Sequence, residues 1–502
     1  MSRIIFISIV GICLFGQQAL AKAQYHDDQS KFNNNWNFRY AVNSATGSDS
    51  NDGSVNRPFA SLTHLSAQTF HGGDGVGLAN GSTWNQSFDM ALPAGVGVYA
   101  YGPGSMPLLD GSDSISAGAW SLTSGKTYTY QASVPLQYAA SKIFIGVWEN
   151  TTQLVLASSV ANCEATAGSY YPSSTTTTPI TLYVHATDGS NPGTNGKTYA
   201  YTNRQQPLSG PSYISGVWTR RNSYQDGSMV VDVSASNCLV TDGSLHNMYV
   251  APGAVISNCT VTNATWNQSG ANGGVLIIVN KNVGAGESVT FNNVTITNTA
   301  QNNNVQGIYG HVNTSGTFGT LTLNNVTISN VYTAVISGGF TGLAVNGGTF
   351  AGSFTGISIG SSRVNIVGAS ITAGSRGLDF QSNTTASVNN NTFLATAGYS
   401  ATDIFGVPKG ATFDGNHFGY GSSGEFAFYD AAGGAQLTVT NSYFRTNGYV
   451  YNLKAASEIV SSDYNTLASY LSGTEYGING TNYNFSGWKT LSGQDSHSTL
   501  LH

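Results

Sequence analysis

The sequence predicts an all-β protein built as a parallel β-helix, a solenoid in which each coil of chain stacks on the one before. Three observations predict it. A short motif recurs along the second half of the chain, an Asn or Gly occupies one fixed place in every copy, and an alternating segment precedes each copy. Repeats of about 20–50 residues are typical of stacked supersecondary units. At 502 residues the chain can bury a continuous core through such a stack.

The repeated motif is four residues long and is visible from residue 237 onward. Its copies read NCLV, NCTV, NVTI, NVTI, GGTF, GASI, NNTF, GNHF and NSYF, and they end at Val240, Val261, Ile296, Ile328, Phe350, Ile371, Phe393, Phe418 and Phe444. Successive ends lie 21 to 35 residues apart. We expect one strand of each coil at this motif, with the two longest steps carrying a longer loop.

The first residue of each copy is the conformational marker. These residues are Asn237, Asn258, Asn293, Asn325, Gly347, Gly368, Asn390, Gly415 and Asn441. Asn and Gly adopt a left-handed backbone at little cost. The sequence therefore predicts a left-handed bend at the same corner of every coil, where stacked Asn side chains can hydrogen-bond as a ladder.

A second alternating segment precedes the motif, and we take it as a strand of another sheet. Because side chains alternate sides along a strand, the inward residues are expected to be Met248, Ile308, Val335, Ile357, Leu378, Ile404 and Phe428. The outward column is then Asp232, Tyr249, Tyr309, His311, Ile336, Ser358, Asp379, Asp403, Phe405, Tyr429 and Tyr451. With coils about 4.8 Å apart, this column predicts a ribbon of aromatic side chains and rare charges.

The remainder of the chain divides into a signal and three accessory parts. Arg3, the apolar run IIFISIVGICLF and small residues up to Ala23 are typical of a cleaved export signal over residues 1–23. A single domain, residues 24–502, then comprises an N-terminal cap with the first coils (about 24–125), a β-rich insertion (about 126–205), regular coils (about 206–465) and a closing segment (about 466–502). We expect a secreted or periplasmic protein without a membrane span.

Charge and composition limit the partners. Only 8% of the residues are Asp, Glu, Lys or Arg, against about 25% in an ordinary soluble domain. The net charge is -6 and no Lys/Arg run occurs, so nucleic acid and membranes are not expected partners. A neutral or mildly charged ligand fits better, and a solenoid capped at both ends predicts a monomer.

Four segments carry a resemblance to a known family. They are SATGSDSNDGSVNRPFASL, GGDGVGLANGSTW, LYVHATDGSNPGTNGKTY and FSGWKTLSGQDSHS. Together they resemble exported bacterial proteins of the right-handed parallel β-helix, pectate-lyase-like superfamily, over nearly the whole mature chain. The resemblance implies carbohydrate processing. The polygalacturonase and pectate lyase motifs are not found in order, so no catalytic residue is carried over.

Asp379 and Asp403 are the main catalytic candidates. On neighbouring coils their carboxyl groups are expected roughly 5–6 Å apart, near the separation that retaining glycosidases use. In such a pair one carboxyl group can remain protonated as the acid. The same pair would also suit calcium in a lyase, and two solvated surface acids are the plain alternative. No other metal or cofactor is expected.

Charged and imidazole side chains provide further candidates. His311 shares a strand and a face with Tyr309, three coils or roughly 14 Å before Asp379, and is expected to orient or protonate a neighbouring sugar. Lys281 and Arg376 would supply the base or the positive charge that a lyase needs. The alternatives are ordinary polar surface for His311 and an ion pair between Arg376 and Asp379.

The aromatic members of the column are expected to bind substrate. Sugar rings stack on flat apolar faces through their C–H surfaces. The predicted substrate-binding residues are Tyr249, Tyr309, Phe405, Tyr429, Tyr451, Arg376, Lys281 and Asp232. Some exposed aromatic rings are also expected simply from the 27 Tyr in the chain.

Two classes of function follow. The first is an enzyme acting on a polysaccharide or oligosaccharide, a glycoside hydrolase ahead of a polysaccharide lyase because the column holds more acids than bases. The second is a noncatalytic glycan-binding surface protein. A cleft walled by the insertion beside Asp379 and Asp403 would favour the enzyme, and a flat, unwalled face would favour the binding protein. Separately, Cys238 and Cys259 occupy equivalent places in adjacent coils, where either a disulfide or two buried thiols fit.

Overall fold

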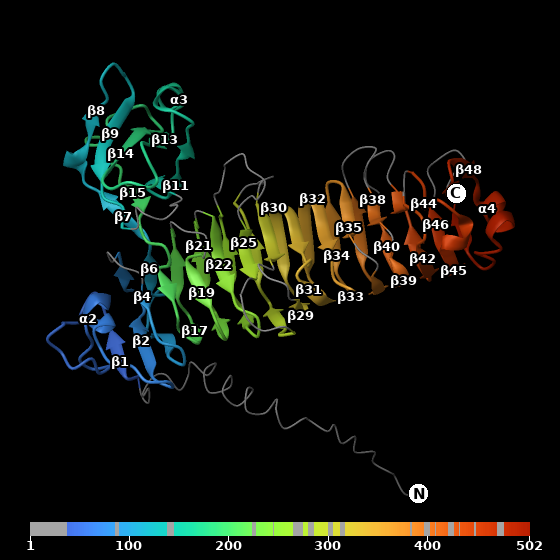
Figure 1. The fold of residues 1–502 in the computed structure, drawn as a ribbon, viewed down its shortest axis with the longest axis horizontal. Coiled ribbons are helices and arrows are strands. Elements are labelled where there is room, and N and C mark those ends of the chain that lie inside the picture. The colour runs from blue at the N-terminus through green and yellow to red at the C-terminus, as the bar shows by residue number, and fades with distance from the viewer. Residues whose placement is uncertain are drawn as a thin grey trace, which may run out of the picture.

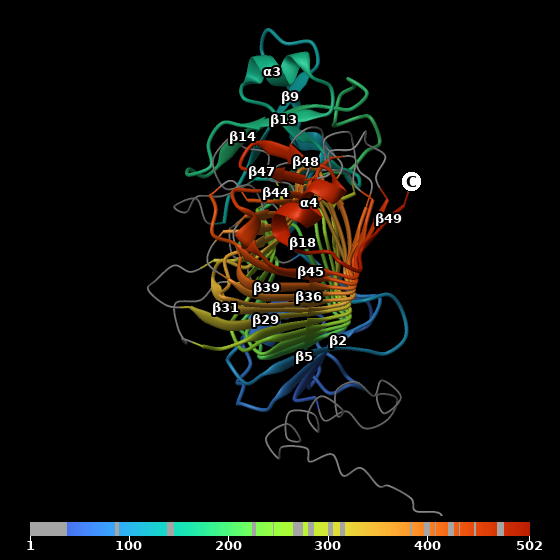
Figure 2. The ribbon, with the colours of Figure 1, turned by 90° about the vertical axis from the view of Figure 1, so that its right-hand side faces the viewer.

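The computed structural model describes residues 38–501 except 86–89, 138–144, 223–226, 244, 265–274, 280–285, 300–304, 312–316, 382–383, 396–401, 407, 420–425, 431, 446–447 and 469–475. Over these residues the chain forms a parallel β-solenoid, which lies horizontally in Figure 1 and is seen end-on in Figure 2. The predicted fold class, a β-helix, is confirmed. Residues 1–23, the predicted signal, lie outside the described part.

The first face of the solenoid is a 14-stranded parallel sheet. Its strands are, in order, β1 (Tyr40–Val42), β2 (Gly75–Ala79), β5 (Gly97–Tyr101), β17 (Tyr213–Ser215), β20 (Ser234–Ser236), β23 (Val255–Ser257), β26 (Val289–Asn292), β29 (Phe318–Asn324), β31 (Phe340–Asn346), β33 (Arg363–Val367), β36 (Thr385–Asn389), β39 (Lys409–Asp414), β42 (Gln436–Thr440) and β45 (Ile459–Asp463).

The second face contains the repeated motif. It consists of β3 (Thr83–Trp84), β6 (Leu108–Asp110), β18 (Trp218–Arg220), β21 (Leu239–Thr241), β24 (Thr260–Thr262), β27 (Thr295–Thr297), the first parts of β30 (Thr327–Ile336) and β32 (Thr349–Ile359), β34 (Ser370–Ala373), β37 (Thr392–Ala395), β40 (His417–Phe418), β43 (Tyr443–Phe444), β46 (Thr466–Ala468) and β49 (Thr499–Leu501).

The third face carries the predicted outward column. Its strands are β4 (Met90–Ala91), β16 (Leu208–Ser209), β19 (Met229–Val231), β22 (His246–Val250), β25 (Val275–Val279), β28 (Gln306–Gly310), the later parts of β30 and β32, β35 (Arg376–Phe380), β38 (Thr402–Gly406), β41 (Phe426–Tyr429), β44 (Tyr451–Leu453) and β47 (Tyr476–Ile478). Because β30 and β32 pass through the corner, the second and third faces are one continuous sheet.

The predicted coil register is confirmed. The nine motif ends pair in sequence order, each with the equivalent residue of the next coil, from Val240 with Val261 to Phe418 with Phe444. These side chains are fully buried, or nearly so, in the core. Phe418, for example, lies between Phe393 and Phe444, with ring centroids 5.2 and 4.7 Å away. The two longest sequence steps therefore keep the same pairing.

The left-handed corner is also confirmed. All nine predicted Asn and Gly residues have φ between 51° and 68°. Asn293 donates from Nδ2 to Oδ1 of Asn258 (3.2 Å), and Asn325 donates likewise to Asn293 (3.0 Å). These side-chain bonds run along the solenoid and link one coil to the next. The corner connects the first face to the second through two residues in each of these coils.

An antiparallel unit interrupts the solenoid after β6. Its 4-stranded sheet contains β7 (Ser112–Ile115), β10 (Val147–Glu149), β11 (Thr152–Gln153) and β15 (Tyr199–Thr202), and its 5-stranded sheet contains β8 (Ser121–Leu122), β9 (Thr129–Val134), β12 (Val155–Leu156), β13 (Ser169–Pro172) and β14 (Ile180–His185). The short helix α3 (Val160–Ala165) packs beside them. The unit has a hydrophobic core of its own and rises from one end of the solenoid (Figure 1).

Buried charges fix this unit to the solenoid. The guanidinium of Arg221 lies 4.6 Å from the ring centroid of Trp148 in β10. Its Nη1 donates to Ser112 Oγ at 3.3 Å and lies 3.8 Å from Asp110 Oδ2. Asp110 in turn pairs with Arg220 at 2.7 Å. Because breaking one partner of such a buried set leaves an uncompensated charge, the insertion is held in one orientation on the first coils.

The C-terminal end of the solenoid is closed by a helix. Asn484 caps α4 (Phe485–Ser492) by accepting from the backbone N–H of Gly487, and Gly493 ends it in the left-handed conformation. Trp488 of α4 is completely buried and stacks on Tyr476 of β47, with ring centroids 4.9 Å apart. The last coil thus covers its open core with an aromatic stack, and Figure 2 shows α4 at the near end.

A pair of buried acids closes one turn near this end. Asp430 Oδ1 accepts from the backbone N–H groups of Ala432 and Gly433, each at 2.8 Å, and Glu458 Oε1 accepts from that of Gly434 at 3.3 Å. The second oxygen of each acid has no hydrogen-bond partner among the described residues. Burial, together with the nearby negative charge of Asp430, raises the pKa of Glu458.

This raised pKa predicts a pH dependence of stability. A folded-state pKa above the unfolded value stabilises the fold below the unfolded pKa, and that contribution disappears as pH rises through the folded value. In the wild type, this group makes the free energy of unfolding higher at mildly acidic pH than at neutral pH. We expect Glu458→Gln to reduce that difference. Urea unfolding midpoints of both proteins at pH 5 and pH 8 measure it. Unchanged pH dependence in the variant would assign the effect to other groups.

Among the described residues, no helix is both long and apolar enough to cross a bilayer.

Candidate functional site

The corner between the second and third faces is shortest at three consecutive coils. Before them, residues 263–274 and 298–305 connect the two faces. β30 and β32 then pass through the corner with no connecting segment, and β34 and β35 are separated only by residues 374–375. From the next coil onward the connections lengthen again. These three coils lie near the middle of the solenoid in Figure 1, with longer connections on the coils before and after them.

A row of rings and one guanidinium follows this short corner. Tyr332 and Phe354 stack almost parallel, with centroids 5.0 Å apart and an interplanar angle of 3°. The guanidinium carbon of Arg376 lies 5.8 Å from the Phe354 centroid and 3.7 Å from that of Phe405 on the following coil. Each member thus touches the next along the axis. We call Tyr332, Phe354, Arg376 and Phe405 the corner row.

Three further rings extend the corner row toward the C-terminal end. Tyr429 stacks on Phe405 with centroids 5.5 Å apart. Phe426 contacts Tyr429 and stacks on Tyr449, in both cases with centroids 5.6 Å apart. The Tyr449 hydroxyl donates to Asn482 Oδ1 at 2.9 Å. All of these rings are half-buried, so the surface is apolar and partly open to solvent.

Stacking limits how these rings can meet a sugar. Arg376 covers the Phe405 ring from the preceding coil and Tyr429 covers it from the following coil. Phe354 covers one face of Tyr332, and among the described residues no other ring contacts Tyr332. Sugars stack on ring faces, and because both faces of Phe405 are covered, Phe405 presents mainly its edge.

Asp379 lies beside the corner row and is paired with Arg376. Arg376 Nη1 donates to Asp379 Oδ2 at 2.8 Å. Asp379 is only 5% exposed, and its Oδ1 has no hydrogen-bond partner among the described residues. A buried carboxylate oxygen without a partner is costly, and a bound ligand or water molecule is one way to satisfy it. The predicted ion pair between Arg376 and Asp379 is confirmed.

The outward column is largely as predicted. Tyr249, Tyr309, Asp379, Phe405 and Tyr429 occupy the same register on the third face. The intervening members are Ile278, Ile336 and Ser358. Of the predicted site residues, the structure brings together Arg376, Asp379, Phe405 and Tyr429.

The outward placement of Asp403 is wrong. Asp403 is fully buried. It precedes inward-facing Ile404 and lies opposite Gly377, and a Cβ on Gly377 would come within 2.5 Å of the Asp403 backbone oxygen. The equivalent residues of other coils, Leu276, Ala334 and Ala427, are buried as well. Asp379 and Asp403 therefore do not form a pair of surface carboxylates.

The outward placement of Tyr451 is also wrong. Tyr451 pairs in register with Phe428 and Tyr476, both of which face the core, and is itself fully buried. Its hydroxyl lies 3.0 Å from Ser462 Oγ, and its ring packs against Trp488 of the closing helix. The outward residue of this coil is Asn452. Tyr451 fills the core where the solenoid closes.

The remaining candidates lie at a distance from Asp379. His311 follows β28, and its ring contacts Tyr309 with centroids 5.3 Å apart. Three pairing steps, about 14 Å, separate this coil from that of Asp379. Asp232 follows β19, a further three steps toward the N-terminal end. Lys281 lies outside the described residues.

Tyr332, Phe354, Phe426 and Tyr449 were missed from the sequence. Tyr332 and Phe354 each stand three residues before an inward residue, Val335 and Ile357, and are one coil apart. Alternation within the strand does not reach this position, because it lies in the corner. The recurrence of an aromatic residue at the coil spacing was the available signal.

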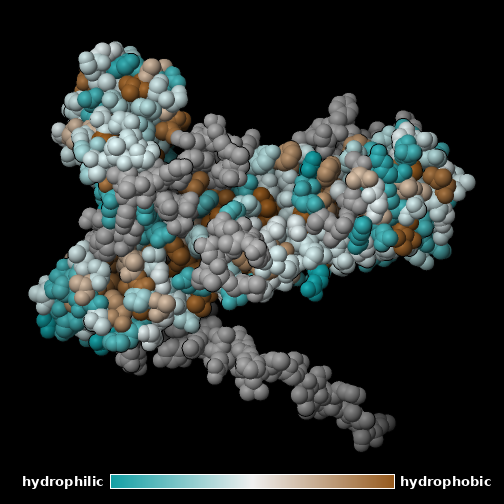
Figure 3. Space-filling view, in the orientation of Figure 1, coloured by the Kyte–Doolittle hydropathy of each residue, from teal (hydrophilic) through white to brown (hydrophobic). Residues whose placement is uncertain are grey.

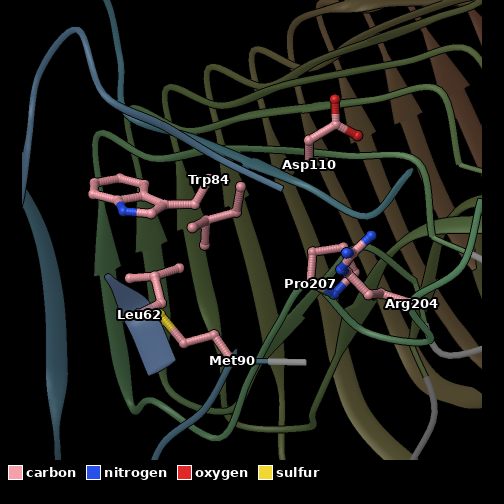
Figure 4. A pocket seen from close by; sticks show the side chains of 7 residues that line it. Leu62, Trp84, Met90, Asp110, Arg204 and Pro207 are labelled. Atoms are coloured by element: carbon pink, nitrogen blue, oxygen red, sulfur yellow. The ribbon is translucent and has the colours of Figure 1, made fainter. Parts of the chain in front are cut away.

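The base of the insertion contains a small pocket outside the corner row. It is lined by Leu62, Trp84, Met90, Leu109, Asp110, Arg204 and Pro207 (Figure 4) and has room for about one water molecule. Figure 3 shows the insertion and the solenoid enclosing an angle nearby, with brown apolar side chains on the solenoid beside it. About seven strand steps, roughly 34 Å, lie between β16, where the insertion rejoins, and β35. The described insertion is therefore no wall beside Asp379.

The described residues contain no group of three or more His, Cys, Asp or Glu side chains placed to hold a metal ion.

Comparisons with known proteins identify the fold. No family model matches the chain, and no curated protein matches it. A solved structure described as the complex of XylC with xylose is similar, with 10% identity, a TM-score of 0.52, and coverage of 88% of this chain and 85% of that one. A structure described as a glycoside hydrolase has 10% identity and a TM-score of 0.45, covering 81% and 96%. At 10% identity the similarity to the XylC structure shows a shared fold and no more.

Proposed function

We propose that this protein is an exported glycan-processing enzyme built on a right-handed parallel β-helix, and that it hydrolyses glycosidic bonds at the short corner of the third face. The observation that carries the proposal is Asp379, a buried carboxylate with one oxygen lacking a partner, beside an aromatic row on the solenoid surface. Such an oxygen can accept a hydrogen bond from a sugar hydroxyl or attack an anomeric carbon.

The residues of the proposed site have separate roles. Arg376 holds Asp379 in place through Oδ2 and leaves Oδ1 for the ligand. In glycoside hydrolysis an ionised carboxylate acts as the nucleophile or as the base that activates water, and a carboxylate paired with a guanidinium suits that role. Tyr332 offers a ring face for the neighbouring sugar. The partner acid is not Asp403, which lies in the core.

The expected ligand is neutral. The corner row contains one guanidinium, and that group is already paired with Asp379, so it does not offer an unpaired charge to a uronate carboxylate. The solved XylC structure of similar fold contains xylose, which supports neutral sugars as the first to test. The scarcity of charged residues along the chain agrees with such a ligand.

A product assay on a glycan panel tests the proposal. The mature protein is incubated with neutral and uronic-acid polysaccharides and oligosaccharides, with and without chelator, and reducing ends and unsaturated uronides are measured together. We expect new reducing ends from a neutral glycan, without unsaturated product and without a chelator effect. Unsaturated product lost with chelator would replace hydrolysis by lyase chemistry. Glycan binding without any product would leave a noncatalytic binding protein.

A further inference from the structure

Two cysteines occupy equivalent positions at the left-handed corners of adjacent coils. Cys238 follows Asn237 and Cys259 follows Asn258, the two left-handed residues of adjacent coils. The strands that begin directly after them pair Leu239 with Thr260, so the cysteines stand in register. Both side chains are buried, at 2% and 1% exposure. They point into the core from equivalent places one coil apart.

Each sulfur atom lies toward the coil before its own, and the Cys238 sulfur is 3.9 Å from the backbone oxygen of Ile214 in β17. The backbone N–H of Cys238 donates to Cys259 Sγ at 3.3 Å, which places the Cys259 sulfur back toward the earlier coil. The Cys238 thiol donates to Ser236 O at 3.1 Å, and the Cys259 thiol to Ser257 O at 3.3 Å. Both cysteines are free thiols in this structure.

The same corner position joins coils further along the chain. Asn391 donates from Nδ2 to Oδ1 of Asn416 at 3.1 Å, and the backbone N–H of Ser442 donates to Asn465 Oδ1 at 2.9 Å. The N–H of Asn465 in turn donates to Ser498 Oγ at 2.8 Å. These residues all stand two before an inward anchor, as Cys238 and Cys259 do. Where the residue two positions before the anchor is polar, its side chain connects neighbouring coils.

We propose that Cys238 and Cys259 form a disulfide bond in the mature protein. In-register strands about 4.8 Å apart place the two Cα atoms within the range that a disulfide spans. The bond forms by thiol–disulfide exchange with a disulfide oxidant during folding, before the corner closes. The two thiols lose two protons and two electrons, one S–S bond forms, and the oxidant is reduced to two thiols. Cys163, in α3 of the insertion, remains a thiol.

The bond would staple the coils next to the insertion. Arg220 in β18 pairs with Thr241 in β21, so the stapled coils lie directly beside the arginines that hold the insertion. Cross-linking adjacent coils removes freedom from the unfolded chain. The expected result is a solenoid that resists unravelling from this end. The inference is independent of the proposed glycan chemistry.

Thiol counting tests the proposal directly. The mature protein, exported or refolded in a glutathione redox buffer, is denatured and alkylated with and without prior reduction, and its peptides are identified by mass spectrometry. We expect alkylation at Cys163 alone without reductant, a linked peptide containing Cys238 and Cys259, and alkylation at all three after reduction. Alkylation of all three without reductant, in both preparations, would overturn the disulfide.

Serine variants separate a bond from simple packing. Refolding wild type under reducing conditions is expected to lower its melting temperature by about 3–5 °C. Cys238→Ser and Cys259→Ser should each show a similar loss and no further response to reductant. A wild type insensitive to reductant, with two destabilised variants, would assign the cysteines a packing role only. Cys163→Ser should leave the response to reductant intact.

Discussion

Replacing Asp379 with Asn is expected to lower kcat on the glycan found by the panel by about 1,000-fold or more. Asn keeps the size of the side chain but supplies neither the charge nor the basic oxygen that attack or water activation requires. Arg376 loses its ionic partner but remains over the Phe405 ring. We therefore expect KM and the melting temperature to change little. Steady-state kinetics and thermal unfolding measure both effects.

A matched control exists on another edge of the solenoid. Glu287 is an exposed carboxylate that precedes β26 on the first face, and Glu287→Gln removes the same charge from the surface. It is expected to retain wild-type kinetics. If Asp379→Asn stays within tenfold of Glu287→Gln, the catalytic carboxylate lies elsewhere. If Asp379→Asn instead raises KM with kcat unchanged, Asp379 serves binding and not catalysis.

The largest effect on stability is expected at Asp495. Its buried carboxylate accepts from Trp488 Nε1 at 2.8 Å and from Ser498 Oγ at 2.6 Å. Ser462 Oγ and Asn465 Nδ2 also donate to it, at 2.9 and 3.1 Å. One side chain thus ties the closing helix to the last coil. Asp495→Ala leaves these buried donors without an acceptor, each at a cost of about 1–3 kcal/mol.

We expect Asp495→Ala to lower the free energy of unfolding by about 3–5 kcal/mol. Urea unfolding followed by tryptophan fluorescence measures it. Ser486→Ala is the control, because Ser486 is an exposed residue of the same helix and its loss should cost little. A loss below about 1 kcal/mol for Asp495→Ala would mean that the closing helix adds little to the stability of the solenoid.

The repeat predicted the coils correctly because it depends on the corner that does not vary. An Asn or Gly with positive φ and an inward anchor three residues later recur without exception, so unequal loops elsewhere did not disturb the pairing. The same positions continue beyond the predicted copies at Gly216 and Tyr464, which also have positive φ. Tyr464 could not be recognised from the sequence, because Tyr is uncommon at positive φ and the repeat was identified by Asn or Gly at this position.

The site was predicted less well because alternation describes only the straight part of a strand. Asp403 stands one residue before an inward anchor, where alternation points outward, but this position is buried here and in the coils on either side, at Gly377 and Ala427. The outward placement of Tyr451 was wrong for another reason. Alternation alone allows either Tyr451 or its neighbours to face the core. The packing of Tyr451 against Tyr476 and Trp488 decides that Tyr451 does.

The corners of the coils differ in how much change they tolerate. From β17 to β46 the Asn/Gly corner is two residues long in every coil, whereas the corner between the second and third faces ranges from no connecting residue at β30 to the whole antiparallel insertion. The Asn/Gly corner therefore acts as a constant spine of the solenoid, and the corner between the second and third faces is the margin where the chain varies in length. Segments exchanged at that margin would alter what the molecule recognises and leave the spine, and with it the folding register, unchanged.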